Sequence, residues 1–373
     1  MPYMVYGNSP WGTMRVGLFG TVALAIGFLA STSGDAAEVP GTAAAPSLAN
    51  VCQSGAVAKV RLPACEALLR DPNLMPKLAA PVFFSIGFAQ IDLHDPDDAL
   101  ISFTRALDRD PAFWPASWAR AQLLDARREY GSAVQDWGQV LSQQPALVGA
   151  YVHRADSEDN LGQTGNALAD YTKAITTASP GDPIDQFYAG RAATQFAAAR
   201  FDLAIADFGE AIARNDRDAQ NYLGRGRAAF LKGDAPTAAG DLRKAVELDP
   251  TNIYAALWLY LAETEAGQDG ADGLRGRIGE LPLTRWPGPL VRVFLGDAKA
   301  EQVQPASTLP AGWSAPDRQA GATCEMAFYM GEYYRLHSQK DQAIASFRAA
   351  IASHVREFVE YHAAESELAR LAR

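Results

Sequence analysis

The histidine and acidic side chains are the first candidates for chemistry in this sequence, because such side chains bind metals and transfer protons. His354 and His362 are eight residues apart, close to two helical turns, and Glu365 follows, so a metal site is one interpretation. A metal site on a helix needs further ligands at i,i+4 spacing, and none follows here. Solvated surface histidines are therefore favoured, and neither a metal nor a cofactor is predicted. The five histidines are His94, His153, His337, His354 and His362.

Three acidic residues, Asp156, Glu158 and Asp159, lie together in the segment RADSEDNLG. They could hold a cation or a basic partner, or they could form a solvated helix face, which is the commoner role of such clusters. The sequence contains no G-x-S-x-G, H-E-x-x-H, G-x-x-x-x-G-K-[ST] or C-x-x-C pattern. We therefore predict that the chain is not an enzyme.

The composition is that of a globular protein with an acidic balance. The chain has 373 residues, 48% of them hydrophobic, and a formal net charge of -10 from 33 Lys and Arg against 43 Asp and Glu. Nucleic-acid binding depends on clustered basic side chains that neutralise phosphates. Nucleic acid is therefore excluded as an expected partner.

The N-terminal segment has the layout of a secretory signal peptide. Residues 16–30, VGLFGTVALAIGFLA, carry no charge; Arg15 precedes them and small residues follow. We predict a signal peptide over residues 1–37, with Met14 as an alternative start, and a disordered linker over 38–50. The mature chain would be periplasmic or secreted, with no stable membrane anchor after cleavage. The alternative is an uncleaved N-terminal anchor, which normally needs about 18 apolar residues.

The interpretation of the three cysteines depends on that export. Cys52 and Cys65 are thirteen residues apart, and an oxidising compartment would let them form a disulfide. A loop of this length contributes on the order of 3 kcal/mol in the chain-entropy description; two buried thiols are the alternative. Cys324 is left over and is expected to pack in a helix without reacting.

A repeat runs through the middle of the chain, in which alanine is followed four residues later by a large side chain and three residues after that by a small one. This spacing places all three on one helical face. Most consecutive segments start 34 residues apart. The segments are ALISFTRAL from Ala99, AVQDWGQVL from Ala133, ALADYTKAI from Ala167, AIADFGEAI from Ala204, AAGDLRKAV from Ala238 and AIASFRAAI from Ala343.

Another small residue stands twelve positions before each leading alanine, on a preceding helix. A short side chain at this position would let the two helices of one repeat approach closely. By contrast, Asp207 and Asp241 lie between the core positions and are expected to be exposed. The small residues are Gly87, Ala121, Ala155, Ala192, Gly226 and Gly331.

With this period and these small residues, the sequence resembles the tetratricopeptide repeat family over about residues 81–250 and 324–356. The resemblance implies an all-α, right-handed superhelical solenoid of antiparallel helix pairs with an irregular C-terminal insertion. The predicted parts are a capping helix over 51–80, five repeats over 81–250, a degenerate repeat and Pro/Gly-rich segment over 251–323, and a repeat-like unit with a capping helix over 324–373.

The C-terminal part resembles a narrower family over about residues 250–370. The segments ALWLYLA, WPGP, CEMAFYMGEYY and EFVEYHAAESEL follow one another as in NlpI-type envelope proteins of Gram-negative bacteria. This resemblance implies a non-enzymatic adaptor that links peptidoglycan hydrolases with a protease. Members of that family are lipoproteins, and the lipobox cysteine is missing here, which suggests a soluble relative.

A solenoid of helix pairs presents an extended concave surface, lined by the first helix of each repeat. The positions expected to face it mix aromatic, amide and acidic side chains, which suits an extended peptide or a partner helix. For each position, packing between repeats is the alternative. The positions are Phe84, Phe88, Ile91, Trp118, Gln122, Asp125, Val152, Asp156, Asp159, Phe196, Arg227 and Phe230.

These features together predict an exported scaffold or adaptor that mediates protein–protein interactions in the bacterial cell envelope. Its expected partners are envelope proteins or extended peptides, and a homo-oligomer is compatible with the sequence. One alternative is an enzyme or carbohydrate-binding module built from residues 265–323. Another is a structural protein that assembles with itself.

Overall fold

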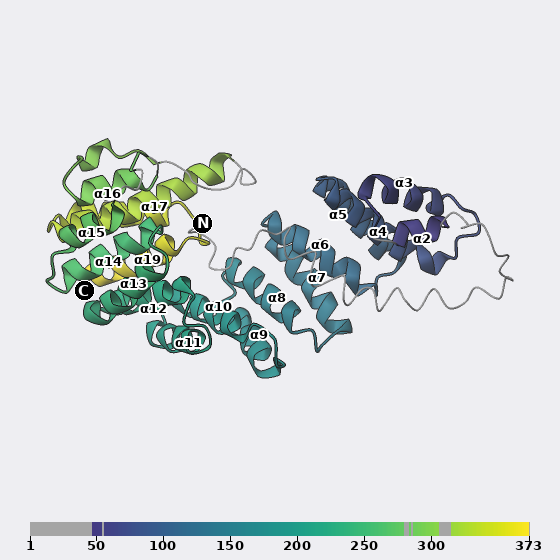
Figure 1. Ribbon diagram of the computed structural model, residues 1–373, viewed down its shortest axis with the longest axis horizontal. Helices are drawn as coiled ribbons and strands as arrows, with labels where there is room; N and C mark the ends of the chain where they lie inside the picture. Colours follow the sequence, from purple (N-terminus) through teal and green to yellow (C-terminus); the bar gives the residue numbers. More distant parts are fainter. Residues whose placement is uncertain (1–46, 54–55, 280–282, 285, 306–314, 373) are drawn as a thin grey trace. The chain divides into compact units, whose positions relative to one another are not determined.

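The computed structural model describes residues 47–53, 56–279, 283–284, 286–305 and 315–372. Within these ranges every regular element is a helix (Figure 1). The predicted signal peptide and most of the predicted linker lie outside the described residues. Helix α2 begins at Leu48, before the predicted end of that linker. Among the residues described, no helix is both long and apolar enough to cross a bilayer.

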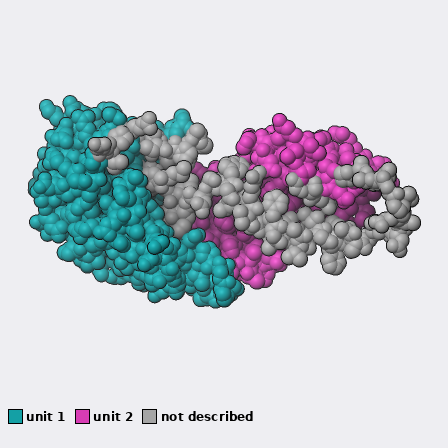
Figure 2. All heavy atoms as spheres, viewed as in Figure 1, with its two compact units in different colours: residues 1–7, 162–373 teal, residues 8–161 magenta. Residues whose placement is uncertain are grey.

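The chain divides into two compact units, coloured separately in Figure 2. The boundary lies between Leu161 and Gly162, inside the repeat array that the sequence predicts. The described helices of unit 2 are α2 (Leu48–Gln53), α3 (Ala58–Leu69), the 3-10 turn η2 (Pro76–Leu78), α4 (Ala79–Asp92), α5 (Pro96–Arg109), α6 (Trp114–Ala126), α7 (Tyr130–Gln143) and α8 (Val148–Asn160).

A disulfide joins α2 to α3, and a small apolar cluster packs them against the repeats. Cys52 of α2 and Cys65 of α3 are bonded to each other, as the sequence predicts, and both are fully buried. They pack with Val82 and Ile86 of α4. Helix α3 therefore covers the apolar side of α4 that would otherwise face water at this end of the array.

Local signals set the boundaries of the helices. Asp95 caps α5 by accepting a hydrogen bond from the backbone N–H of Asp98, and Pro96 occupies the first helical position. In unit 1, α12 ends at Gly233, whose φ of 97° lies in the left-handed region that glycine adopts without strain. Asp234 then caps α13 through the N–H of Thr237. Short turns of this kind keep paired helices antiparallel.

Small residues let the helices of a pair approach each other, as the repeat pattern predicts. A Cβ atom on Gly87 of α4 would lie 2.4 Å from the Phe103 ring of α5. In unit 1, a Cβ on Gly331 would lie 2.5 Å from the Phe347 ring. The large residue of the second helix therefore fills the space left by the small residue of the first.

Unit 1 is a longer array with an aromatic core. Its helices are α9 (Thr164–Thr177), α10 (Ile184–Ala197), α11 (Phe201–Arg214), α12 (Ala219–Lys232), α13 (Ala235–Leu248), α14 (Ile253–Glu265), α15 (Gly270–Ile278), α16 (Gly288–Phe294), the 3-10 turn η3 (Ala300–Gln302), α17 (Ala315–Leu336), α18 (Lys340–Ile351) and α19 (Val359–Leu371).

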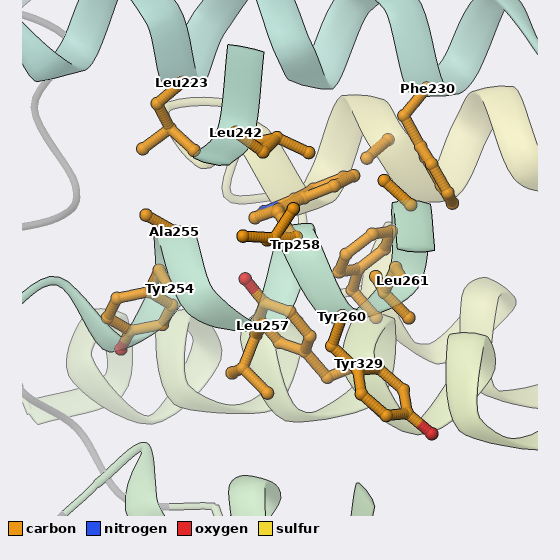
Figure 3. Packing of buried hydrophobic residues seen from close by; sticks show 14 of the residues in the cluster. Leu223, Phe230, Leu242, Tyr254, Ala255, Leu257, Trp258, Tyr260, Leu261 and Tyr329 are labelled. Atoms are coloured by element: carbon orange, nitrogen blue, oxygen red, sulfur yellow. The ribbon is translucent and has the colours of Figure 1, made fainter. Parts of the chain in front are cut away.

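Helix α14 is the centre of that core, because every residue from Tyr254 to Glu263 is buried. Figure 3 shows its Trp258 among the surrounding apolar side chains. The indole stacks on Phe328 of α17, with ring centroids 5.2 Å apart, and meets the edge of Phe230 of α12 at 5.6 Å. The aromatic residues of the C-terminal helices thus pack these helices together.

Candidate binding groove

Helix α6 carries a row of side chains with both aromatic and polar character. Trp118, Gln122 and Asp125 follow at spacings of four and three, so they share one face of the helix. Trp118 and Gln122 are half-buried. The indole Nε1 of Trp118 and the amide Oε1 of Gln122 have no hydrogen-bond partner in the described structure. A donor and an acceptor therefore stand one helical turn apart without a partner.

Asp125 is held at the end of this row by two hydrogen bonds. Ser157 of α8 donates to its Oδ1 at 2.6 Å, and Trp137 Nε1 of α7 donates to its Oδ2 at 2.9 Å. Burial raises the pKa of Asp125 to about 6, while the two hydrogen bonds act in the opposite direction. The carboxylate fixes α6, α7 and α8 to one another.

His153 of α8 completes an aromatic cluster beside the row. Its ring lies parallel to Trp137, with centroids 4.9 Å apart, and meets Trp118 edge-on at 5.7 Å. Desolvation lowers the pKa of His153 to about 4, so the imidazole is neutral at physiological pH. His153 therefore acts as an aromatic packing residue, which sequence reasoning missed.

Buried ion pairs connect the first and second helices of several repeats. Arg191 of α10 donates from Nε and Nη2 to both carboxylate oxygens of Asp207, at 2.7 and 2.8 Å. Arg225 pairs with Asp241 in the same way, at 2.7 Å for both bonds. The expectation that Asp207 and Asp241 are exposed is wrong, because each lies buried against its arginine.

The signal for these pairs is a spacing of sixteen residues between arginine and aspartate. It holds for Arg120 with Asp136, which form two hydrogen bonds of 2.7 Å in unit 2. The same spacing recurs in the sequence at Arg154 and Asp170. A comparison of equivalent positions between repeats would have revealed the pairs.

The repeats match models of a known family. Family models described as tetratricopeptide repeat match residues 86–148, 148–179 and 190–253. The chain contains tetratricopeptide repeats. The matched ranges begin in α4 and end at the start of α14, so they include the first five repeat segments but not the pair α17 and α18. The narrower resemblance of the C-terminal part to NlpI-type proteins stays a prediction.

Several solved structures align with parts of this chain at low sequence identity. PilW, described as a widely conserved type IV pilus biogenesis factor, is 16% identical and aligns over 58% of this chain and 98% of its own, with a TM-score of 0.49. YrrB, described as having an unusual peptide-binding site, is 15% identical over 51% and 96%, with a TM-score of 0.45. The C-terminal part of a repeat protein from Cytophaga hutchinsonii is 16% identical over 72% and 94%, with a TM-score of 0.47.

The predicted groove residues of unit 2 have two kinds of surroundings. Phe84 is buried and packs around Phe103 with Phe88, at centroid distances of 5.8 and 5.5 Å, which makes this pair part of the core. Trp118 and Gln122 form the half-buried row on α6. Asp156 and Asp159 of α8 are half-buried, and both interact within the chain.

The predicted groove residues of unit 1 are all buried. Phe196 packs against Phe201 at 5.7 Å, and Phe230 is completely enclosed. The guanidinium of Arg227 lies 5.3 Å from the Trp258 ring centroid. These tetratricopeptide repeat positions are therefore covered by other parts of unit 1.

The remaining candidate residues, His362 and Cys324, are held by contacts within the fold. His362 bonds to the carbonyl oxygen of Arg356 at 2.8 Å and to Glu365 at 3.2 Å. Within the described residues, no three His, Cys, Asp or Glu side chains converge on a metal position. Burial raises the pKa of Cys324 to about 12, which keeps it as an unreactive thiol.

Proposed function

We propose that the chain is a scaffold that binds a protein partner through the α6 row of unit 2, in the cell envelope. Tetratricopeptide repeats present extended surfaces on which peptides and helices dock. The observation that carries the proposal is the unpaired donor of Trp118 beside the unpaired acceptor of Gln122. A peptide backbone supplies the complementary carbonyl and N–H groups.

The mode of binding follows from the burial of these two atoms. Both are shielded from solvent in this conformation, so a ligand reaches them after a side-chain rotation. Two buried polar atoms without partners are unfavourable, and a bound backbone relieves that cost. The Trp118 ring offers an aromatic anchor of the kind that dominates binding energy at protein interfaces.

Site-specific photo-crosslinking in the full chain tests the proposed surface. A benzophenone amino acid at Gln122 should capture a reproducible protein, identified by mass spectrometry in the cells that produce the chain. The matched control is the same substitution at Gln135, which is exposed on α7 of the same repeat. Equal capture at both positions, or none at Gln122, would reject the surface.

A second measurement separates binding from structure. Trp118→Phe keeps an aromatic ring and removes the Nε1 donor together with part of the ring area. Loss of one hydrogen bond is worth about 0.5–1.5 kcal/mol, so affinity for the captured partner should fall by at least about twofold and by up to about thirteenfold from this bond. Trp114→Phe, at the start of the same helix, should leave the affinity unchanged.

The location in the envelope rests on the disulfide between Cys52 and Cys65, since such bonds persist in oxidising compartments. N-terminal sequencing of the mature protein and thiol titration of the denatured chain test it. We expect cleavage near residue 37 and one titratable thiol, from Cys324. Three free thiols in protein taken directly from cells would place the chain in a reducing compartment.

A further inference from the structure

The C-terminal helix α19 lies on the side of unit 1 that the first helices of the repeats form. It contacts α10 and α12, the first helices of two pairs far earlier in the sequence, as well as α17 and the preceding α18 (Figure 1). A helix that only capped the last pair would not reach back to α10. Helix α19 therefore occupies the surface that a solenoid of this kind offers to ligands.

The first half of α19 is enclosed on all sides. All five positions from Glu360 to Ala364 are buried, and so is Glu367. A helix on a protein surface buries one stripe, whereas five consecutive buried residues include every face. Ala363 and Ala364 are fully buried and let neighbouring helices approach closely.

Charged groups mark where α19 meets the rest of unit 1. Arg370 donates from Nη1 to Glu265 of α14 at 2.8 Å, and Glu265 also accepts from Arg335 of α17 at 2.8 Å. Glu367 lies 3.6 Å from Arg335 and accepts a hydrogen bond of 3.0 Å from Nε of Arg370. These contacts order Arg370 and Glu367 on one side of α19.

Glu360 provides the second charged contact. It accepts a long hydrogen bond of 3.5 Å from the Tyr329 hydroxyl of α17. Burial raises the pKa of Glu360, and the positive charge of Arg227 on α12 acts in the opposite direction. Arg227 is thus the basic residue of α12 whose charge acts on the acid of α19.

Several buried polar atoms at the interface of α19 lack hydrogen-bond partners, which is unusual in a protein core. Glu360 Oε2, Glu367 Oε1 and Arg227 Nε are buried without a hydrogen-bond partner. Buried charges rarely gain more than their desolvation costs, so α19 is held less firmly than an apolar helix of its size. Residues 352–358 connect α18 to α19, and His354 has a φ of 56° there.

We propose that α19 is the resident ligand of a helix-binding groove formed by α10, α12 and α17, and that a partner helix with the same acidic and small residues displaces it. The partner is an amphipathic helix that presents a glutamate to Arg227, small residues one turn later, and a glutamate and an arginine at the positions of Glu367 and Arg370. The α6 row in unit 2 plays no part in this groove.

Binding of a labelled peptide with the sequence of residues 355–373 to the full chain tests the proposal. In the Glu360→Lys chain, the resident helix is repelled by Arg227 while the groove keeps its own residues. We expect this chain to bind the peptide at least tenfold more tightly than the wild-type chain does. A peptide that carries the same Glu360→Lys change should bind neither chain.

Two further variants control the experiment. Glu365→Lys changes the same charge on an exposed position of α19 and should bind the peptide as weakly as the wild type. Adding Arg227→Glu to the Glu360→Lys chain restores opposite charges, so the resident helix should dock again and peptide binding should return to the wild-type level. A folded Glu360→Lys chain that binds the peptide no better than wild type overturns the proposal.

Hydrogen exchange of the wild-type chain gives an answer even if Glu360→Lys fails to fold. A resident ligand leaves its groove without unfolding of the groove, so the amides of α19 should exchange as a group faster than those of α17. Exchange of α19 and α17 in a single step would show that α19 is an inseparable part of the core, and would refute its displacement.

Discussion

Arg191 shows how a single side chain connects three helices of unit 1. From α10 it donates two hydrogen bonds to Asp207 of α11, and its Nη1 donates to Thr172 of α9 at 3.0 Å. The hydrogen bonds to Asp207 raise the pKa of Arg191, against the effect of desolvation. In unit 2, Arg120 makes the equivalent contacts to Asp136 and Thr104.

Loss of the aspartate should therefore destabilise unit 1. Removing one partner of a buried ion pair costs about 3–5 kcal/mol; because Arg191 keeps some contact with water, we expect Asp207→Ala to lower the free energy of unfolding by about 2–3 kcal/mol. Denaturant unfolding followed by circular dichroism measures this. Asp202→Ala on the same helix removes an exposed partner of Lys232 and should leave the stability unchanged.

An effect of Asp207→Ala no larger than that of Asp202→Ala would contradict the role of the buried pair. The sequence analysis missed this role for a physical reason. Periodicity assigns a residue to a helix face from hydrophobicity alone, so Asp207 between two core positions is assigned to solvent. The arginine that makes its burial favourable lies sixteen residues away on another helix.

At the scale of helices, each large residue of a second helix lies between two first helices. Phe208 of α11 is close to Gly224 of the following α12, where an added Cβ would lie 2.4 Å from the ring. Gly190 has the same relation to Tyr171, also at 2.4 Å. In unit 2, His153 stands at the equivalent position and stacks on Trp137.

The sequence predicted half of this arrangement. It identified the small residue of the same repeat, because that position is small in all six segments. The position that faces the next repeat holds glycine in two cases and histidine in another, so no common residue type marks it. For helices α2 and α3, the sequence predicted the disulfide between Cys52 and Cys65, because disulfide formation depends on the spacing of the cysteines and on the compartment.

A methyl group added at the position that faces the neighbouring repeat should push the two repeats apart. Overpacking of a filled core costs about 1–3 kcal/mol, so we expect Gly224→Ala to lower the melting temperature. The matched control is Gly240→Ala on α13, where nothing lies within 4 Å of the added Cβ. Alanine is favoured over glycine in helices by about 1 kcal/mol, so the control should be neutral or stabilising. Stabilisation by both variants would show that the contact at Gly224 is not close.

At the scale of the whole chain, the sequence predicted the repeats but neither the division at Gly162 nor the return of α19 to α10 and α12. The repeat pattern continues through residue 162 unchanged. Such a pattern predicts contacts between helices that are neighbours along the array, and no others. The final helix was expected to cap the last pair, because nothing in its composition specifies contacts with helices more than 120 residues earlier.

The buried acids around α19 should give the two units different responses to pH. Burial and the neighbouring Glu332 raise the pKa of Glu367 to about 8, above the usual value near 4.5, with Arg335 and Arg370 opposing. A raised folded-state pKa gives stability that is present at low pH and is lost as the pH rises through about 8. In unit 2, the shifted groups that titrate below pH 9 are His153 and Asp125, with pKa values of about 4 and 6, and their protonation hardly changes above pH 6.5.

We therefore expect the helices α17 and α19 to gain about 2 kcal/mol of protection when the pH falls from 9 to 6.5, at about 1.4 kcal/mol for each unit of pH below 8. Hydrogen exchange corrected for intrinsic rates measures this, with α6 and α7 as the internal reference that should not change. Glu367→Gln keeps the shape of the side chain and removes its charge. It should reduce the pH dependence of the protection of α19, with Glu332 and Glu360 keeping a smaller part of it, and should increase the protection at pH 9; a variant that keeps the full wild-type pH dependence would show that another group is responsible.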